Sequence, residues 1–400
     1  MGFFNPIKYL SRKNEVILAS MVEPDEVQYI PEMRRYCASV ETYVRPRERD
    51  TLRLARGFFW DPPGSAAKYW DAGYARLIGD CIGRYGIDLV EFQHLNMAAY
   101  RDQAGSVPAI LREHNVEYKV WERYAVHARS PFERLYMKRC APRVRAFEAK
   151  MAPNFARCLT VSQADARHLI EIAPSARVEA IPSGVDTEYF YPSPEIPEEP
   201  YRMVMTGSFE WKPKQHNLRV LLTEIMPRIQ AKLPQAKLDV VGKGVPAELR
   251  NLAESMPGVR VTGTVPDVRP YVWRAALVLN YLESGGGIAL KVLEAMAMRK
   301  PVLSNSFGCE GIETENGRDV LLADGTEDFA AAAAHLLVDA PMRRSLAENG
   351  CQKAQAFYSW GVLANRFQDC YEAVIAEHAE ANPALTSAPR APASAAVGAN

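Results

Sequence analysis

Short apolar runs alternate along this chain with longer segments in which apolar residues recur every three or four positions. An apolar run of a few residues predicts a buried strand, and the longer period predicts an amphipathic helix. In the first half, strands are predicted at 16–19, 89–92, 107–111, 158–161 and 178–181, and helices at 66–85 and 131–151. Strands that alternate with helices are typical of α/β domains with parallel sheets.

The same alternation restarts beyond residue 201. Strands are predicted at 202–205, 237–241, 259–261, 275–282 and 301–304, and helices at 218–233, 329–337 and 341–358. The strands run into glycines, which are Gly207, Gly242, Gly263 and Gly285–Gly287. Because ligands bind beyond the carboxyl ends of parallel strands, we expect these glycines to gather at one rim, in a cleft between the two halves.

The length of 400 residues exceeds what one hydrophobic core usually serves, so two domains are expected. Four prolines within ten residues can continue neither a helix nor a central strand, so 191–201 is predicted to be a linker. The predicted order is a first domain at 1–190, this linker, a second domain at 202–362, a helix at 363–380 that returns to the first domain, and a disordered tail at 381–400.

Charge and cysteine content exclude several classes of protein. The 48 basic and 48 acidic residues balance, so nothing indicates a nucleic-acid partner. Seven cysteines form no C-x-x-C pair, which fits reduced thiols and neither a zinc site nor a disulfide framework. No apolar run reaches about 18 residues, and the start lacks the pattern of a signal peptide. We therefore expect a cytoplasmic protein without a membrane span.

The segment Ser284–Ala297 carries the most specific chemistry. Three glycines end an apolar run and open a helical one, so the backbone can approach a ligand closely. A helix N-terminus presents unpaired N–H groups and attracts phosphate. Lys291 in the first turn adds a positive charge, and Glu294 on the same face can accept both hydroxyls of a ribose. This spacing predicts a nucleotide site.

A strand, a glycine turn and a helix also connect many α/β units that bind no ligand. The loop contains neither the G-x-G-x-x-G of a dinucleotide site nor the G-K-[ST] of a P-loop. On spacing alone, both interpretations remain open.

Five segments resemble motifs of glycosyltransferase family 4. Ile181–Phe190 resembles its "PNGVDxxxF", and Thr160–Asp165 resembles its "TVSxAD". Met205–Pro213 resembles "FTGSMDWxPN", Gly285–Ala297 resembles "GGGTRLKILEAMA", and Phe357–Trp360 is similar to a closing "YSW". The last three are typical of a subgroup tied to bacterial exopolysaccharide. Each single match is weak evidence of a resemblance, whereas five matches in family order are strong evidence of one.

The resemblance implies a GT-B fold, with two Rossmann-like domains facing a cleft and a nucleotide diphosphate sugar held by the second. It implies sugar transfer with retention of configuration, without a metal or another cofactor, in which N–H groups, a helix N-terminus and basic side chains stabilise the leaving diphosphate. The catalytic residues implied are His114, Lys291 and Glu294. The donor-binding residues implied are Gly207, Ser208, Lys212, Val265, Gly285, Gly286, Gly287, Ile288, Lys291 and Glu294.

His114 matches a family histidine that follows a strand of the first domain and contacts the donor sugar. Alone, such a histidine is more often a packed or loop residue, and the neighbouring Glu113 and Asn115 favour the functional interpretation. His94, after the preceding strand, is a second candidate.

Two departures from the family concern charge near the donor. Many members carry E-x7-E, and Gly286 stands where the first glutamate would be, as in the subgroup; Glu283 is a candidate substitute. Ala289 and Ser208 stand where relatives carry arginine, so positive charge at the diphosphate is expected to rest on Lys291, with Lys212 and Lys214 as helpers.

The third departure is at the start. Relatives begin with a strand, a glycine-rich loop and a helix, whereas this chain begins inside that helix, at about residues 4–12. The first domain is thus expected to miss its first strand and glycine-rich loop, with an exposed sheet edge. We favour a start annotated too late over a degraded copy.

The function expected is transfer of a hexose to a glycan or lipid-linked acceptor, in bacterial polysaccharide or cell-envelope synthesis. The alternatives are a catalytically impaired GT-B remnant that binds nucleotide or a partner transferase, and a sugar-nucleotide epimerase, which the family motifs disfavour. The basic helix 131–151 can dock peripherally on the inner membrane or present a solvated face, and both interpretations stay open.

Overall fold

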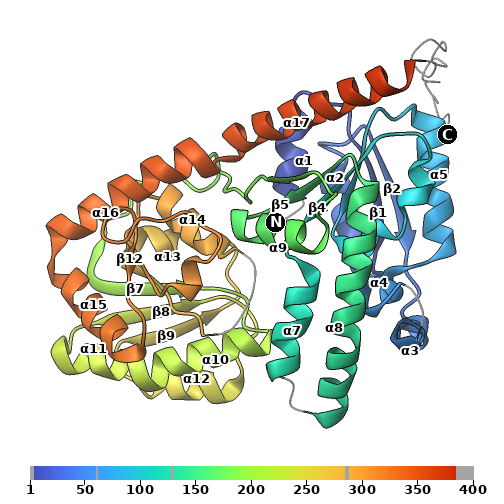
Figure 1. Cartoon of the computed structure of the whole chain (residues 1–400). Coiled ribbons are helices and arrows are strands. Elements are labelled where there is room, and N and C mark those ends of the chain that lie inside the picture. Colours follow the sequence, from blue (N-terminus) through green and yellow to red (C-terminus); the bar gives the residue numbers. More distant parts are fainter. Residues whose placement is uncertain (1–3, 60–61, 128–129, 284–287, 384–400) are drawn as a thin grey trace. The chain divides into compact units, whose positions relative to one another are not determined.

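A computed structural model describes residues 4–59, 62–127, 130–283 and 288–383 (Figure 1). Contacts divide the chain into two compact units, Met1–Pro182 with Ala364–Asn400, and Ser183–Leu363. The division therefore differs from the predicted linker at 191–201, which lies within the second unit. The carbonyl of Tyr191 accepts a hydrogen bond from the Trp273 indole at 2.7 Å, so this proline-rich segment packs onto the second unit.

The first unit contains a four-stranded parallel sheet in the order β3-β4-β5-β6. Its strands are β3 (Val90–Gln93), β4 (Ala109–Glu113), β5 (Arg157–Thr160) and β6 (Val178–Ala180). Every residue of β4 is buried, as expected for a central strand with helices on both faces. The long helix α17 (Trp360–Ala381) joins this unit from Ala364 onward, and its Glu377 pairs with Arg157 at 2.5 Å.

A separate parallel pair, β1 (Ile17–Val22) and β2 (Ser39–Val44), completes the strands of the first unit. Within the described residues no ladder joins this pair to β3–β6, so β1 and β3 each have one open edge. The Tyr74 hydroxyl donates to the carbonyl of Ala19 at 2.9 Å, which holds a helix against β1.

The first unit contains several helices that were not predicted, and one predicted helix is divided. The helices are α1 (Phe4–Leu10), α2 (Ile30–Met33), α3 (Asp50–Phe59), α4 (Gly64–Tyr69), α5 (Ala72–Tyr85), α6 (Leu95–Ala98), α7 (Glu117–His127), α8 (Pro131–Met151) and α9 (Gln163–Ile172). The single helix predicted at 66–85 is two, α4 and α5. The break occurs because Asp71 is extended and caps α5, accepting a hydrogen bond from the amide of Gly73 at 2.8 Å.

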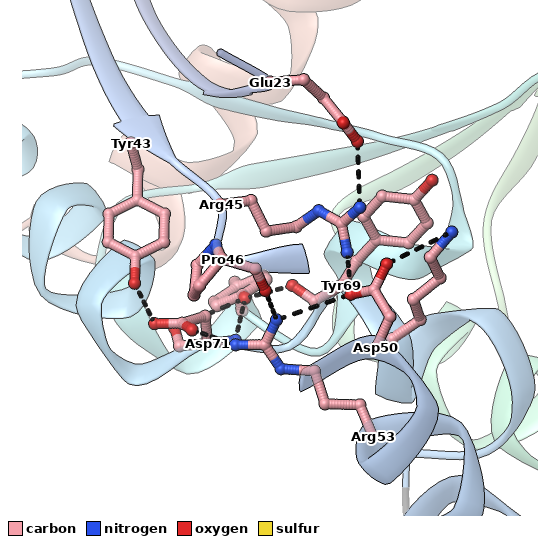
Figure 2. A network of polar contacts seen from close by, with 10 residues as sticks. Glu23, Tyr43, Arg45, Pro46, Asp50, Arg53, Tyr69 and Asp71 are labelled. Atoms are coloured by element: carbon pink, nitrogen blue, oxygen red, sulfur yellow. Dashed lines mark hydrogen bonds and ion pairs between the residues drawn. The ribbon is translucent and has the colours of Figure 1, made fainter. Parts of the chain in front are cut away.

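A polar network ties the ends of β1 and β2 to α3 and α5 (Figure 2). Arg45, directly after β2, contacts Glu23 at 3.0 Å and Asp50 at 2.5 Å. Arg53 of α3 contacts Asp71, which also accepts a hydrogen bond from a tyrosine hydroxyl of β2 at 2.7 Å. Because Arg45 is buried, these partners compensate a charge that would otherwise be costly in the interior.

The second unit is built on a six-stranded parallel sheet in the order β12-β11-β10-β7-β8-β9. The strands are β7 (Glu199–Thr206), β8 (Lys237–Val241), β9 (Val259–Gly263), β10 (Ala275–Asn280), β11 (Val302–Ser304) and β12 (Leu321–Leu322). Alternate residues of β7 enter different cores. Met203 and Met205 pack with the first cluster of this unit and Val204 packs with the second, so the sheet is covered on both faces.

The helices of the second unit are α10 (Lys212–Val220), α11 (Met226–Lys232), α12 (Ala247–Glu254), α13 (Arg269–Arg274), α14 (Leu290–Ala297), α15 (Thr326–Val338) and α16 (Ala340–Lys353). A π-helical turn at Leu221–Ile225 joins α10 to α11, so the helix predicted at 218–233 is longer at its start. Because all strands are parallel, the carboxyl ends of β7, β8, β9 and β10 lie at one edge of the sheet.

Candidate functional site

Three glycines meet at the carboxyl edge of the second sheet. The amide of Gly207 donates to the carbonyl of Val241 at 3.0 Å, and the amide of Gly242 donates to that of Gly263 at 3.1 Å. Gly242 has φ +143°, and a Cβ built there would lie 1.6 Å from the carbonyl oxygen of Gly207. No other residue fits at 242, because the Gly207 carbonyl occupies the space that a side chain would need, so the two strand ends pack backbone against backbone.

The segment between β7 and α10 carries two of the predicted donor-binding residues. Ser208 is half-buried and its hydroxyl donates to the carboxylate of Glu210 at 3.1 Å. Glu210 in turn pairs with Lys243 at 2.9 Å. Lys212 is exposed and is the first residue of α10. The charge at this corner is thus mixed, with a carboxylate beside the predicted phosphate site.

Two buried side chains fix the chain at the exit of β10. The Asn305 side chain accepts from the amide of Leu282 at 3.1 Å and donates to its carbonyl at 2.7 Å. Asn280, the last residue of β10, donates to the Ser304 hydroxyl at 2.9 Å. Because both amides are buried, the backbone that leads into the glycine segment is held on two sides.

The predicted residues Gly285, Gly286 and Gly287 lie outside the described residues. Ile288 is described again, is half-buried and packs against the buried cluster around Val292. Val265, which follows β9, packs against the same cluster. The structure therefore brings Ile288 and Val265 together with the helix that carries Lys291 and Glu294.

Lys291 and Glu294 occupy the half-buried face of α14, whereas the residues between them are buried in the core. Burial lowers the pKa of Lys291 to about 8, and the nearby Lys214 acts in the same direction. Burial also raises the pKa of Glu294 to about 7, although the charge of Lys291 opposes this. Each group is thus short of solvation, and a ligand that supplies a phosphate and hydroxyls would restore it.

In the first unit, two histidines lie at the carboxyl ends of neighbouring strands. His114 follows β4 and His94 follows β3, and their rings are 4.4 Å apart. The His114 Nε2 lies 2.8 Å from the side-chain oxygen of Gln93. Burial, assisted by the charge of Arg112, lowers the pKa of His94 to about 4 and that of His114 to about 2. Both rings are neutral at neutral pH and can exchange hydrogen bonds with an uncharged hydroxyl.

The structure also shows polar residues that the sequence did not indicate. Glu113, which the sequence offered only as a neighbour of His114, is buried beside Glu148 of α8. Glu148 accepts hydrogen bonds from the first amides of α7, those of Glu117 at 2.8 Å and Tyr118 at 3.3 Å. One signal was available: Glu148 is the only acid between Arg134 and Met151, in a segment otherwise rich in cations.

Within the described part of the chain, no three His, Cys, Asp or Glu side chains gather in a way that could hold a metal ion. No helix among the described residues combines the length and apolar character needed to cross a membrane.

Family models match both parts of the chain. Residues 26–189 match the family described as Glycosyltransferase Family 4, and residues 200–339 match the family described as Glycosyl transferases group 1. Phosphatidyl-myo-inositol mannosyltransferase of Mycolicibacterium smegmatis is 28% identical over 54% of this chain and 57% of its own length. D-inositol 3-phosphate glycosyltransferase of Kineococcus radiotolerans is 27% identical over 56% of this chain and 58% of its own. The chain spans little more than half the length of these relatives.

Solved structures resemble the whole chain more evenly. Sucrose-phosphate synthase of Thermosynechococcus elongatus has a TM-score of 0.66 and 17% identity, and covers 93% of this chain and 92% of its own. Anabaena HepE in complex with UDP and glucose has a TM-score of 0.68 and 13% identity, and the match covers 92% of this chain and 95% of the HepE chain. At such identities the likeness establishes the fold alone.

Proposed function

The chain belongs to glycosyltransferase family 4 and has the GT-B fold, and from that premise we propose that it transfers a hexose from a nucleotide diphosphate sugar, with retention of configuration. The acceptor proposed is a glycan or a lipid-linked molecule, in bacterial polysaccharide or cell-envelope synthesis. We propose that the reaction needs no metal or other cofactor, so that the protein itself stabilises the leaving diphosphate.

The observation that carries this proposal is the pair Lys291 and Glu294 on α14. An ammonium and a carboxylate that burial shifts toward their neutral forms, next to a helix N-terminus, are complementary to a diphosphate and a ribose. Phosphate charge near Lys291 would favour its protonated form, and hydroxyls that donate to Glu294 would favour its ionised form. Donor binding and the charged state of both side chains would therefore support each other.

The remaining residues are proposed to surround these two. Gly207, Ser208 and Lys212 would face the phosphates, and Gly285, Gly286 and Gly287, which lie outside the described residues, are proposed as further donor-binding residues. Ile288 and Val265 would contact the donor beside the apolar cluster that supports α14. In the first unit, the neutral ring of His114 would donate a hydrogen bond to a sugar hydroxyl or accept one from it. A protonated imidazole could only donate.

Calorimetry with a panel of nucleotide diphosphate sugars tests the assignment. Lys291→Ala and Glu294→Ala are each expected to weaken donor binding about tenfold or more, because each removes a charged hydrogen-bond partner. Lys232→Ala and Glu254→Ala are matched controls, since both side chains are exposed on other helices of the same unit. If both test variants bind every donor as tightly as the wild-type protein does, the assigned site is wrong.

The acceptor and the location of the protein are part of the same proposal. The name of the Mycolicibacterium relative describes transfer to a phosphatidylinositol, which supports a lipid-linked acceptor here. We place the protein in the cytoplasm with a peripheral contact to the inner membrane. The exposed cations of α8 support that contact, and they are Arg134, Lys138, Arg139, Arg145 and Lys150.

Sedimentation with vesicles tests the membrane contact. Vesicles with anionic phosphatidylglycerol are expected to retain the protein at low salt, and neutral phosphatidylcholine vesicles are not. Replacing Arg134, Lys138 and Arg139 with glutamine should release it. Equal retention on both kinds of vesicle would contradict an electrostatic contact.

A catalytically impaired remnant is the second candidate, and one observation favours it. The Ser208 hydroxyl is engaged by the Glu210 carboxylate, at the position where relatives carry a phosphate-binding arginine. A remnant would bind the donor and neither transfer nor hydrolyse it, whereas the enzyme would transfer the sugar to an added acceptor.

A further inference from the structure

A group of polar side chains lies on one face of the first sheet. Glu91 and Gln93 are two residues apart on β3, so they point to the same face. Arg112 of β4 and His114, which follows that strand, are also two residues apart, and Gln93 lies opposite Arg112 in the parallel register. The Arg112 guanidinium lies over the Phe367 ring of α17 at 4.4 Å, so this helix covers polar groups. Burying such groups costs free energy unless they are hydrogen-bonded, so their partners matter.

Hydrogen bonds join these side chains in series. The Tyr371 hydroxyl of α17 donates to one carboxylate oxygen of Glu91, and the side-chain amide of Gln93 donates to the other. The side-chain oxygen of Gln93 lies 2.8 Å from the Nε2 atom of His114. The series therefore runs from α17 across β3 to the end of β4.

The chemistry of Glu91 determines the direction of these hydrogen bonds. An ionised carboxylate only accepts, so the Gln93 side chain turns its NH2 group toward Glu91 and its oxygen toward His114. An amide oxygen also only accepts, so the His114 Nε2 carries the ring proton. Burial raises the pKa of Glu91, whereas the charge of Arg112 and the hydrogen bond from Tyr371 favour the ionised form. These neighbours thus stabilise the form that sets the direction.

The surroundings of His114 also keep its ring neutral and in place. Burial and the charge of Arg112 lower its pKa to about 2. The ring of His94 lies 4.4 Å away, and His94 has φ +69°, a conformation that non-glycine residues rarely adopt and that surrounding contacts must hold. One such contact is the hydrogen bond from the His94 amide to the Arg112 carbonyl at 2.8 Å. A neutral ring with its proton on Nε2 has its acceptor lone pair on Nδ1.

We propose that Gln93, held by Glu91 and Tyr371, fixes His114 in the Nε2–H tautomer, so that Nδ1 accepts a hydrogen bond from a hydroxyl group of the substrate. The tautomer follows from contacts within the first unit alone. The hydrogen bond to the substrate rests on the proposed function and gives the interaction of His114 a direction. Glu91, Gln93 and Tyr371 are positioning residues, because they act through the imidazole.

NMR spectroscopy of the full chain with isotope-labelled histidine reads the tautomer, because protonated and unprotonated ring nitrogens give different signals. The signals of His114 are assigned by their loss in His114→Gln. We expect the wild-type ring to carry its proton on Nε2. Gln93→Lys places only donors beside Nε2 and should move the proton to Nδ1. The matched control Gln163→Lys, exposed at the start of α9, should leave the tautomer unchanged.

Two further variants test the residues behind Gln93. Glu91→Gln keeps the size of the side chain, but its amide donates as well as accepts, so Gln93 is no longer turned one way. Both tautomers of His114 should then be populated. Tyr371→Phe leaves the Gln93 amide as a donor to Glu91 and should change the tautomer less.

Calorimetry connects the tautomer with recognition. Wild type, Gln93→Lys and Gln163→Lys are titrated with UDP, GDP, UDP-glucose, GDP-mannose and the deoxyfluoro analogues of the accepted sugar nucleotide. Fluorine in place of the recognised hydroxyl cannot donate, so it should weaken binding to wild type and to the control about tenfold. In Gln93→Lys the ring presents an N–H instead, and the same replacement should change binding little. Binding of the free nucleotide should be equal in all three proteins.

The outcomes separate the inference from its premise. A wild-type ring with its proton on Nδ1, or a proton that stays on Nε2 in Gln93→Lys, overturns the role of Gln93 and leaves the nucleotide site standing. An equal effect of fluorine in wild type and Gln93→Lys overturns the hydrogen bond to the substrate. A wild-type protein that binds none of the nucleotides or sugar nucleotides overturns the proposed function, whereas the tautomer is measured without them.

Discussion

The packing at Gly242 permits a quantitative prediction for the substitution Gly242→Ala. An alanine Cβ would lie 1.6 Å from the Gly207 oxygen, whereas real Cβ atoms essentially never approach closer than 3.0 Å. The backbone would therefore have to separate by about 1.4 Å. Since the clash is with main chain and not with a flexible side chain, no rotamer change can relieve it.

The cost can be built from its parts. A separation of this size breaks the hydrogen bonds from Gly207 to Val241 and from Gly242 to Gly263, each worth about 1 kcal/mol net. Alanine at a positive φ adds about 1–2 kcal/mol. The free energy of unfolding should fall by about 3–4 kcal/mol, which is a large share of the 5–15 kcal/mol typical of a domain.

Urea unfolding followed by circular dichroism measures this loss, with Gly263→Ala as the control. Gly263 has φ +71°, but the nearest atom to its built Cβ is the end of the Arg250 side chain at 3.8 Å. The control should therefore lose only the dihedral contribution, about 1–2 kcal/mol. If the two variants lose the same stability, the close approach at 242 is not a constraint and the reasoning fails. Gly242→Ala should also lose nucleotide binding, because it displaces the rim.

The remaining predictions concern stability. Burial and the neighbouring Glu148 raise the pKa of Glu113 well above its usual range, so the folded state retains a proton that the unfolded chain releases above about pH 4.5. The free energy of unfolding of the wild-type protein should therefore fall as pH rises. Urea unfolding at about pH 5 and pH 8 measures this fall, and Glu113→Gln should remove part of it. Burial raises the pKa of Asp71, but its hydrogen bonds and Arg53 outweigh burial and lower it, so the stability that the ionised carboxylate contributes is present above its unfolded pKa and is lost as pH falls through its folded pKa. Asp71→Asn should lower the free energy of unfolding by about 2–4 kcal/mol near pH 7 and by little at about pH 2. An equal loss at both pH values would show that the charge of Asp71 is not what stabilises the fold. Asn305→Ala should speed hydrogen exchange of the Leu282 amide, which Asn305 holds, with little change in the amides of β8. Unchanged exchange at Leu282 would show that another group holds that segment.

Local patterns in the sequence predicted the fold class well. The apolar runs became strands within two or three residues, and the helix predicted at 131–151 is α8 with the same bounds. Period and capping are properties of neighbouring residues, so they are visible in the chain before it folds. The strand-end glycines likewise predicted a rim, because parallel strands bring their carboxyl ends to one edge.

Boundaries that depend on packing were harder to predict from the sequence. The proline-rich segment at 191–201 has the composition of a linker, yet it packs on Trp273 and belongs to the second unit. The break between α4 and α5 has no proline or glycine signal at its centre, and arises because the Asp71 side chain is engaged by α3 and β2.

The sequence by itself determined the alternation of strands and helices, the family motifs, and Lys291 and Glu294 as neighbours on one turn of helix. Only the tertiary structure decided that Glu283 meets His216 across 67 positions of sequence, and that Glu113 is buried against Glu148. The physical reason is that periodicity specifies which face of an element is apolar, whereas the partner of a polar side chain depends on sheet order and packing between elements far apart in the chain.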